Sequence, residues 1–162
     1  MLIRKAEVSD IQSMVSIEKG SPGYPAWGEN GLSAELRNPL AFVLTAEENG
    51  TVIGFAGARF LPPQAELNTI VTRAEHAGKG VARAFLDRIF EEAAVKGCSC
   101  VTLEVDEANA AAMALYVKKG FKIVGRRPKF YNGERDAVLM TAELKSEKVR
   151  PQRKAFGAGG SP

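Results

Sequence analysis

The chain has 162 residues, of which 45% are apolar and 25% are charged, and this length and composition predict one globular domain with a full core. No apolar run is as long as a membrane span, and the first ten residues lack the apolar segment of a secretory signal. The net charge of +3 is concentrated at the end of the chain, because residues 145–162 carry five basic side chains and one acidic side chain. The remaining body is therefore slightly acidic, which excludes a basic nucleic-acid-binding platform, and we expect neither nucleic acid nor membrane as a partner.

The segment at residues 145–162 differs in composition from the rest. It is polar, basic and rich in glycine, and such a segment cannot bury enough apolar surface to fold by itself. We therefore expect a single domain over residues 1–144, followed by a disordered basic and glycine-rich tail.

The chain has two cysteines and one histidine. Cys98 and Cys100 lie two apart in one expected strand, where both would point to the same side and a disulfide could hardly join them. Reduced cysteines favour a cytoplasmic location. Together with His76 they are too few and too scattered for a metal site or a catalytic nucleophile, so we expect no metal.

The first third of the chain predicts a strand and two helices. Residues 2–7 alternate apolar and charged side chains, which is the period of a strand. Asp10 can cap a helix that ends near Gly20. Residues 21–31 form a loop rich in proline and glycine, and a short helix is expected near residues 32–36.

The middle of the chain predicts a hairpin and then a strand, a helix and a strand. Residues 41–60 contain two strand patterns joined at Asn49-Gly50, a strong hairpin signal, and Pro62-Pro63 interrupts the chain after them. A strand over residues 65–72, an amphipathic helix from Val81 to Lys96 and a strand over residues 98–106 follow. This βαβ order predicts two parallel strands joined by a right-handed crossover.

The last part predicts one more helix and a pair of strands. Asn109 can cap a helix that Gly120 closes, and residues 121–127 and 135–144 have strand patterns. With the hairpins antiparallel and the βαβ strands parallel, the fold class is α/β, a mixed sheet covered by helices.

The loop at residues 76–82 lies between a strand and the start of the long helix. The unpaired N–H groups of a helix start favour anions, and Gly78 and Gly80 would let a pyrophosphate approach the backbone closely. The loop has neither the GK[ST] ending of a Walker loop nor the GxGxxG pattern. By itself it is equally consistent with a turn that merely needs glycine.

Several motifs of the chain resemble those of the GNAT superfamily of acetyltransferases. The sequence AGKGVA at residues 77–82 resembles the family's Q/R-x-x-G-x-G/A loop for coenzyme A, with alanine at the first position. LEVDEANAAAMALYVKKGFKIVGRRPKFY at residues 103–131 resembles the pattern LEVR-x-x-N-x-x-A-x-x-LY-x-x-x-GF of the RimI-type ribosomal-protein alanine N-acetyltransferases, with Asp106 in place of the arginine. Gly133, Asp136-Ala137 and Met140 match the family's next motif, and Pro25-Ala26-Trp27 weakly resembles its Pro-Trp pair. The resemblance covers roughly residues 40–144.

The resemblance implies a GNAT fold, in which a mostly antiparallel mixed sheet contains one central parallel βαβ pair and has helices on its sides. It implies acetyl-CoA as cosubstrate and direct attack of an amine on the thioester. The acceptor it implies is the N-terminal α-amino group of a protein, with a small-subunit ribosomal protein as the candidate partner.

The resemblance also assigns residues to roles. Such a transfer needs a base for the amine and a proton for the departing thiolate, and the family pattern gives these roles to Glu104 and Tyr116. The residues implied to bind the cofactor are Ile70, Val71, Thr72, Ala77, Gly78, Lys79, Gly80, Val81, Ala82 and Asn109. Those implied to contact the substrate are Asp106, Tyr131 and Asp136. Without the family pattern, Glu104 would be interpreted as an exposed strand carboxylate and Tyr116 as a packing residue.

Two other functions stay open from the sequence. One is a GNAT enzyme that acetylates a small-molecule amine or amino acid, which the departures at Asp106, Thr72 and Ala77 allow. The other is a non-catalytic module that binds coenzyme A, which an intact Glu104 and Tyr116 disfavour. Tyr131 and Asp136 favour the peptide acceptor over the small amine.

Overall fold

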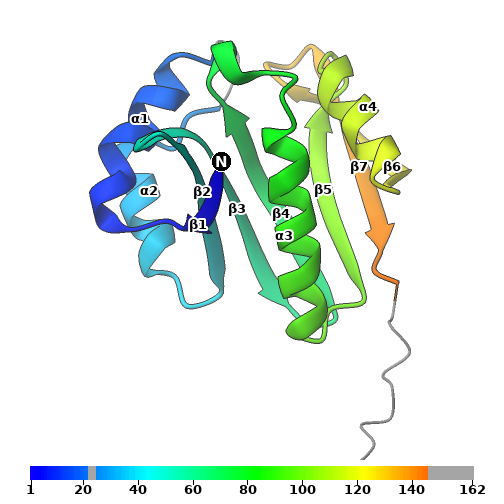
Figure 1. Ribbon diagram of the computed structural model, residues 1–162. Helices are drawn as coiled ribbons and strands as arrows, with labels where there is room; N and C mark the ends of the chain where they lie inside the picture. Colours follow the sequence, from blue (N-terminus) through cyan, green and yellow to red (C-terminus); the bar gives the residue numbers. More distant parts are fainter. Residues whose placement is uncertain (22–24, 146–162) are drawn as a thin grey trace, which may run out of the picture.

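The computed structural model describes residues 1–21 and 25–145, so that the predicted tail at residues 145–162 lies outside this part except for Lys145 (Figure 1). Seven strands form one sheet in the order β1-β2-β3-β4-β5-β7-β6. The strands are β1 (Leu2–Lys5), β2 (Ala41–Glu48), β3 (Thr51–Leu61), β4 (Gln64–Thr72), β5 (Cys100–Asp106), β6 (Lys122–Tyr131) and β7 (Arg135–Glu143). The helices are α1 (Ile11–Lys19), α2 (Gly28–Arg37), α3 (Val81–Val95) and α4 (Ala110–Lys118), with short 3₁₀ turns η1 (Val8–Asp10) and η2 (Ala74–His76).

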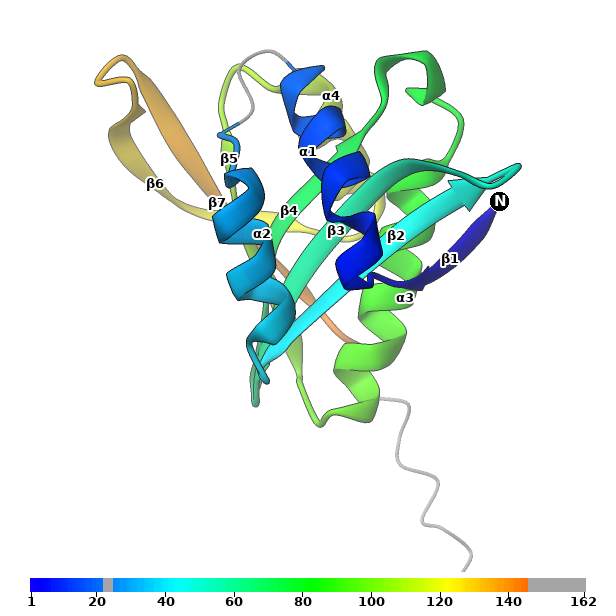
Figure 2. The same cartoon turned by 90° about the vertical axis from the view of Figure 1, so that its left-hand side faces the viewer.

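The sheet is mixed, as the sequence predicted. Only β4 and β5 pair in parallel, while all other neighbouring strands are antiparallel. Helices α1 and α2 cover one face of the sheet and α3 covers the other (Figure 2). Phe85, Leu86 and Ile89 of α3 are fully buried in the larger core cluster. Met14 of α1 and Leu32 of α2 are buried in the smaller cluster on the opposite face.

The parallel pair is short, because β4 and β5 are paired only in their N-terminal parts and have an opening between their C-terminal parts. Residues Gln64–Leu67 of β4 pair with Cys100–Leu103 of β5, and the pairing ends there. At this point β4 contains a bulge, because Leu67 pairs with Ala58 of β3 and Thr69 with Gly57, which leaves Asn68 as the extra residue. An extra residue reverses the alternation of side chains along a strand. Accordingly Leu67 packs in the α3 cluster, whereas Val71 packs in the cluster under α1 and α2.

Three local predictions differ from the structure. α2 begins at Gly28, four residues earlier than the pattern suggested, because the buried Glu18 of α1 accepts hydrogen bonds from the Trp27 and Gly28 N–H groups. β1 ends at Lys5, since a capping box between Glu7 and Asp10 starts the η1 turn. Cys98 precedes β5, so it does not share a strand face with Cys100, and both cysteines are free.

The first strand and the start of the first helix are joined by a partly buried ion pair. Arg4 Nη1 and Nη2 donate to Asp10 Oδ2 and Oδ1 at 2.8 and 2.9 Å, and the Glu7 N–H donates to Asp10 Oδ2 at 2.7 Å. The hydrogen bonds from Arg4 lower the pKa of Asp10 below its ordinary value of 3.8, against the opposing effect of burial. A carboxyl whose pKa is lower in the folded state stabilises the fold above its unfolded pKa, and this stabilisation is lost as the pH falls through the folded pKa.

We therefore expect Asp10→Asn to lower the free energy of unfolding at pH 7 by about 1.5–3 kcal/mol, the usual range for a hydrogen bond to a charged group. The difference from the unmodified protein should shrink as the pH falls below about 4, where the unfolded carboxyl becomes protonated. Urea unfolding across this pH range measures both quantities. Glu134→Gln, at an exposed carboxylate of the β6–β7 turn, is the control and should change little. A deficit in Asp10→Asn that is constant from pH 7 to pH 2.5 would contradict the role of the ion pair.

Candidate active site

The two catalytic candidates lie on opposite faces of the sheet, next to the opening between β4 and β5. On β5, Leu103 and Val105 are buried in the α3 cluster, so Glu104 between them points to the face that carries α1 and α2. Tyr116 of α4 packs against the α3 cluster, with its ring 5.5 Å from that of Phe121 in an edge-on contact. A group held in the opening could therefore be approached by Glu104 from one face and by Tyr116 from the other.

Glu104 lines a cavity of about 620 Å³, which we call the Glu104 cavity. Its walls come from β4, β5 and the β6–β7 hairpin, and they include Glu66, Asn68, Thr102, Arg127 and Tyr131. Arg127 Nη2 lies 2.9 Å from Glu104 Oε1. Burial raises the pKa of the Tyr131 phenol, and the nearby negative charges of Glu104 and Asp106 raise it further. Tyr131 is thus a neutral hydroxyl beside the carboxylate.

The other two candidate substrate residues are bonded within the protein. Asp106 accepts from the Ala108 N–H at 2.9 Å and from Arg135 Nε at 2.9 Å. The bond from Ala108 and then the contact with Arg135 lower the pKa of Asp106. Asp136 accepts from the Lys129 N–H at 3.0 Å, in the irregular part of β6. Both carboxylates hold turns beside the cavity, and their contact with a substrate stays a prediction.

The predicted cofactor loop precedes α3. Gly78 and Gly80 have φ angles of 74° and 85°, which favour glycine, and Gly80 is the N-cap residue of the helix. A Cβ atom added at either glycine would meet nothing within 4 Å. The glycines therefore satisfy the backbone conformation and leave open space before the first turn, where Ala77, Lys79 and Gly80 are exposed. Such a helix start can bind an anion.

The remaining residues predicted to bind the cofactor differ in whether a ligand could reach their side chain or only their backbone. The Val71 and Val81 side chains are buried in the core, so these residues could reach a ligand only through the backbone. Ile70 packs partly against the α3 cluster, and Thr72 is half-buried. Asn109 caps α4, since its side chain accepts from the Ala112 N–H at 3.1 Å. Ala82 follows Val81 in the first turn of α3, half-buried.

Several residues at the site were not found from the sequence. Arg127 reaches Glu104 across β7, because β7 lies between β5 and β6 in the sheet. Asn68 lines both the Glu104 cavity and a second cavity of about 520 Å³ under α2. The only signals in the sequence were a basic pair at Arg126-Arg127 and a polar residue inside a strand. Neither signal indicates a partner far along the chain.

Residues 1–21 and 25–145 contain neither a cluster of metal-ligating side chains nor a membrane-spanning helix. No group of three or more His, Cys, Asp or Glu side chains is placed to hold a metal ion. None of the helices there is long and apolar enough to cross a membrane.

Comparison with known proteins gives consistent matches. The model of the acetyltransferase (GNAT) family matches residues 9–121. The [ribosomal protein bS18]-alanine N-acetyltransferase of Escherichia coli K12 is 30% identical over 146 residues, which cover 88% of this chain and 97% of the relative. The crystal structure of the ribosomal-protein-S18-alanine N-acetyltransferase from Escherichia coli has a TM-score of 0.81 at 27% identity, covering 88% of this chain and 93% of that one. A PaiA N-acetyltransferase from Thermoplasma acidophilum in complex with coenzyme A has a TM-score of 0.76 at 20% identity, covering 88% and 98%.

Glu18 positions one wall of the second cavity, because its carboxylate accepts from the Trp27 N–H at 2.7 Å and the Gly28 N–H at 3.1 Å. An amide at this position has one acceptor oxygen, so Glu18→Gln leaves one of the two N–H groups without its partner. We expect this change to lower the free energy of unfolding by about 1–3 kcal/mol. Glu29→Gln removes an exposed charge at the same helix start and is the matched control. Equal melting temperatures of the two variants would show that Glu18 does not hold the start of α2.

Proposed function

The chain belongs to the GNAT family of acetyltransferases, and from this membership we propose that it transfers the acetyl group of acetyl-CoA to the N-terminal α-amino group of a protein. The observation that carries the proposal is the opening between β4 and β5, with Glu104 on one face and Tyr116 on the other. The named relatives support a protein N-terminus as acceptor, and a small-subunit ribosomal protein is the partner we propose. We propose residues 1–144 as the catalytic domain and the cytoplasm as its location.

The cofactor side of the proposal uses the face that carries α3 and α4. The N–H groups at the start of α3, within residues 77–82, would hold the pyrophosphate of coenzyme A. The C-terminal part of β4, from Asn68 to Thr72, extends past the last residue pair with β5 and offers its backbone to the pantetheine amides. Asn109 would contact the cofactor at the start of α4 while it caps the helix.

The acceptor side uses the Glu104 cavity. Glu104 takes a proton from the α-ammonium group, and the neutral amine attacks the thioester carbon. An α-amino group, with a pKa of about 8, gives up this proton more readily than a lysine side chain, with a pKa of about 10.4. The tetrahedral intermediate collapses with cleavage of the C–S bond, and Tyr116 donates its phenolic proton to the departing thiolate.

Arg127 has a defined place in this scheme. Its guanidinium contacts the same carboxylate that would accept the proton. An entering ammonium group therefore competes with Arg127 for Glu104, and the ion pair with Arg127 can form again once Glu104 has passed the proton it took from the amine on to solvent.

The role of the loop can be tested at two glycines with similar backbones. Gly80 and Gly97 have φ angles of 85° and 84°, and at neither would a Cβ meet an atom within 4 Å. Gly80→Ala and Gly97→Ala should each lose about 1–2 kcal/mol of stability from the same backbone strain. Only Gly80→Ala should also lose affinity for acetyl-CoA, by about tenfold or more, because its methyl group occupies the space of the pyrophosphate.

Calorimetric titration with acetyl-CoA and thermal melting of both variants measure these effects. Gly97 lies beyond the far end of α3, whose 15 residues span about 22 Å at 1.5 Å per residue. Unchanged acetyl-CoA affinity in a folded Gly80→Ala protein would reject the loop as the pyrophosphate site.

The catalytic pair is tested by pH–rate profiles on a peptide with N-terminal alanine. Tyr116→Phe keeps the ring and its contact with Phe121, and kcat should fall by roughly 10²–10⁴ while acetyl-CoA affinity is kept. Glu104→Gln should lower kcat most at low pH, where the amine is mostly protonated and needs the base. At high pH the free amine is more abundant, so the defect should become smaller.

Three results would contradict parts of this proposal and would each assign a different role. A defect of Glu104→Gln that does not change with pH would assign Glu104 to binding the ammonium group. Wild-type kcat in Tyr116→Phe would return Tyr116 to a packing role. Activity on small amines but on no peptide would favour the small-molecule acceptor.

A further inference from the structure

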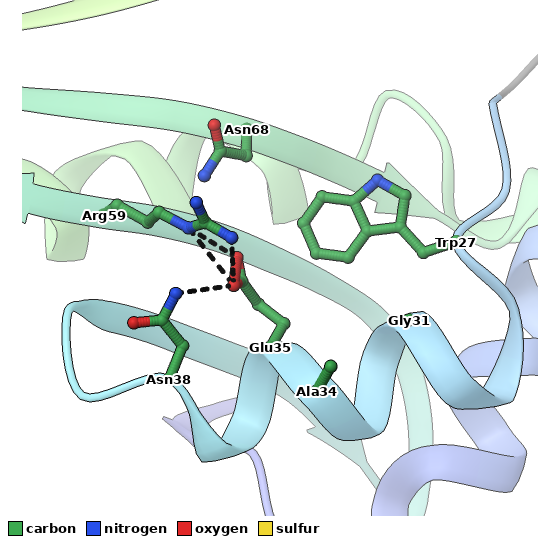
Figure 3. A pocket seen from close by; sticks show the side chains of 7 residues that line it. All are labelled: Trp27, Gly31, Ala34, Glu35, Asn38, Arg59 and Asn68. Carbon is green, nitrogen blue, oxygen red and sulfur yellow. Dashed lines mark hydrogen bonds and ion pairs between the residues drawn. The ribbon is translucent and has the colours of Figure 1, made fainter.

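The second cavity, which we call the Arg59 pocket, lies between α2 and strands β3 and β4 (Figure 3). It has a volume of about 520 Å³. Its lining includes Trp27, Gly31, Ala34, Glu35, Arg59 and Asn68.

An ion pair between the buried Glu35 and the partly exposed Arg59 forms the floor of the Arg59 pocket. Glu35 is 4% exposed, and Arg59 donates to it through Nε at 3.1 Å and Nη2 at 2.7 Å. Asn38 contributes a longer contact of 3.5 Å to the same carboxylate. The Glu35 carboxylate is therefore occupied, and it has little capacity left to bind a cationic ligand.

Two polar groups above this floor have capacity left. Within the described residues, Arg59 Nη1 and the side-chain amide of Asn68 make no hydrogen bond with the protein. The amide of Asn68 points toward the guanidinium group of Arg59, and the indole ring of Trp27 lies beside them (Figure 3). An acceptor oxygen between Arg59 and Asn68 would satisfy both groups, with the indole ring as an apolar wall.

The Arg59 pocket adjoins the Glu104 cavity. Asn68 lines both of them, and Glu66, which lines the Glu104 cavity, is the cross-strand partner of Arg59. Both lie on the face of the sheet to which Glu104 points. A polypeptide with its N-terminus at Glu104 advances about 3.3–3.6 Å per residue, so a side chain within its next few residues could reach the adjoining Arg59 pocket.

We infer that the Arg59 pocket is a specificity subsite for the acceptor polypeptide, and that it takes an uncharged side chain with an acceptor oxygen, of the glutamine or asparagine class, shortly after the acetylated residue. The inference rests on the proposed function. Glu35 and Glu66 offset the charge of Arg59, which disfavours a carboxylate in the pocket. A basic side chain would bring its charge against the guanidinium group of Arg59, and the Glu35 carboxylate is already occupied. An amide is uncharged, and its flat group fits against the indole ring.

The first measurement is kcat/KM for peptides with N-terminal alanine that carry glutamine, methionine or glutamate at position 2, 3 or 4. Methionine has nearly the length and shape of glutamine without the acceptor oxygen. We expect glutamine to exceed methionine by about tenfold at one of these positions, because methionine leaves the two donors unpaired. Glutamate should be a poorer substrate than glutamine at that position.

The second measurement fills the pocket. Ala34 is an exposed residue of α2 that lines the pocket, so Ala34→Met occupies the space without disturbing the core. Asn30→Met places the same side chain at an exposed position of α2 outside the lining and is the matched control. This design avoids Arg59 variants, which would leave the buried Glu35 without its partner and could unfold the protein. The preference for glutamine should fall to within about twofold in Ala34→Met and persist in Asn30→Met.

A third measurement follows binding without catalysis. Trp27 is the only tryptophan of the chain, so its fluorescence reports directly on the pocket. With coenzyme A in place of acetyl-CoA no acetyl group is transferred, and the glutamine peptide should change the emission in the wild-type and Asn30→Met proteins more than in Ala34→Met.

The outcomes separate the inference from the proposed function. Equal rates for all peptides, a preference for glutamate, or a glutamine preference that survives in Ala34→Met would overturn the subsite while the N-terminal acetyltransferase stands. No acetylation of any peptide by a protein that binds coenzyme A would overturn both.

Discussion

The bulge at Asn68 is the constraint on which the rest of the site depends. One extra residue in β4 ends the regular alternation, so that Leu67 packs under α3 and Val71 packs under α1 and α2. The parallel pairing with β5 stops at the same place. Without this interruption β4 and β5 would stay paired along their length, and the sheet would separate Glu104 from Tyr116. The bulge turns a continuous sheet into one with an opening between two faces.

The charges around the opening are arranged in pairs, which limits what each carboxylate can do. Asp106 and Asp136 hold the turns near the hairpin, through Ala108 and Lys129. Glu104 instead contacts Arg127, whose side chain is 58% exposed and thus able to move. Among these carboxylates, Glu104 therefore combines a place in the cavity with a partner that an incoming cation can displace. This difference in partners, more than the number of carboxylates, distinguishes a candidate base from structural residues.

The sequence predicted what depends on nearby residues. The hairpin at Asn49-Gly50, the cap at Asn109 and the helix after Gly80 all follow from signals within a few positions, and the structure has each of them. The βαβ order also predicted the parallel pair of β4 and β5. The early start of α2 was not predictable in this way, because it depends on Glu18 in another helix. Likewise, the contact of Arg127 with Glu104 depends on the strand order, which places β7 between β5 and β6.

The wall of the Arg59 pocket formed by α2 has a consequence for how such an enzyme can diverge. Gly31 and Ala34 are small residues on a helix that contributes no candidate catalytic group, whereas Asn68 belongs to both cavities. Larger or differently shaped side chains at positions 31 and 34 would reshape the pocket and leave the opening in the sheet intact. Descendants of one ancestral chain could thus exchange recognition elements on α2 while inheriting the same reaction centre. A library of variants restricted to this helix is accordingly the economical route to an enzyme with a new preference.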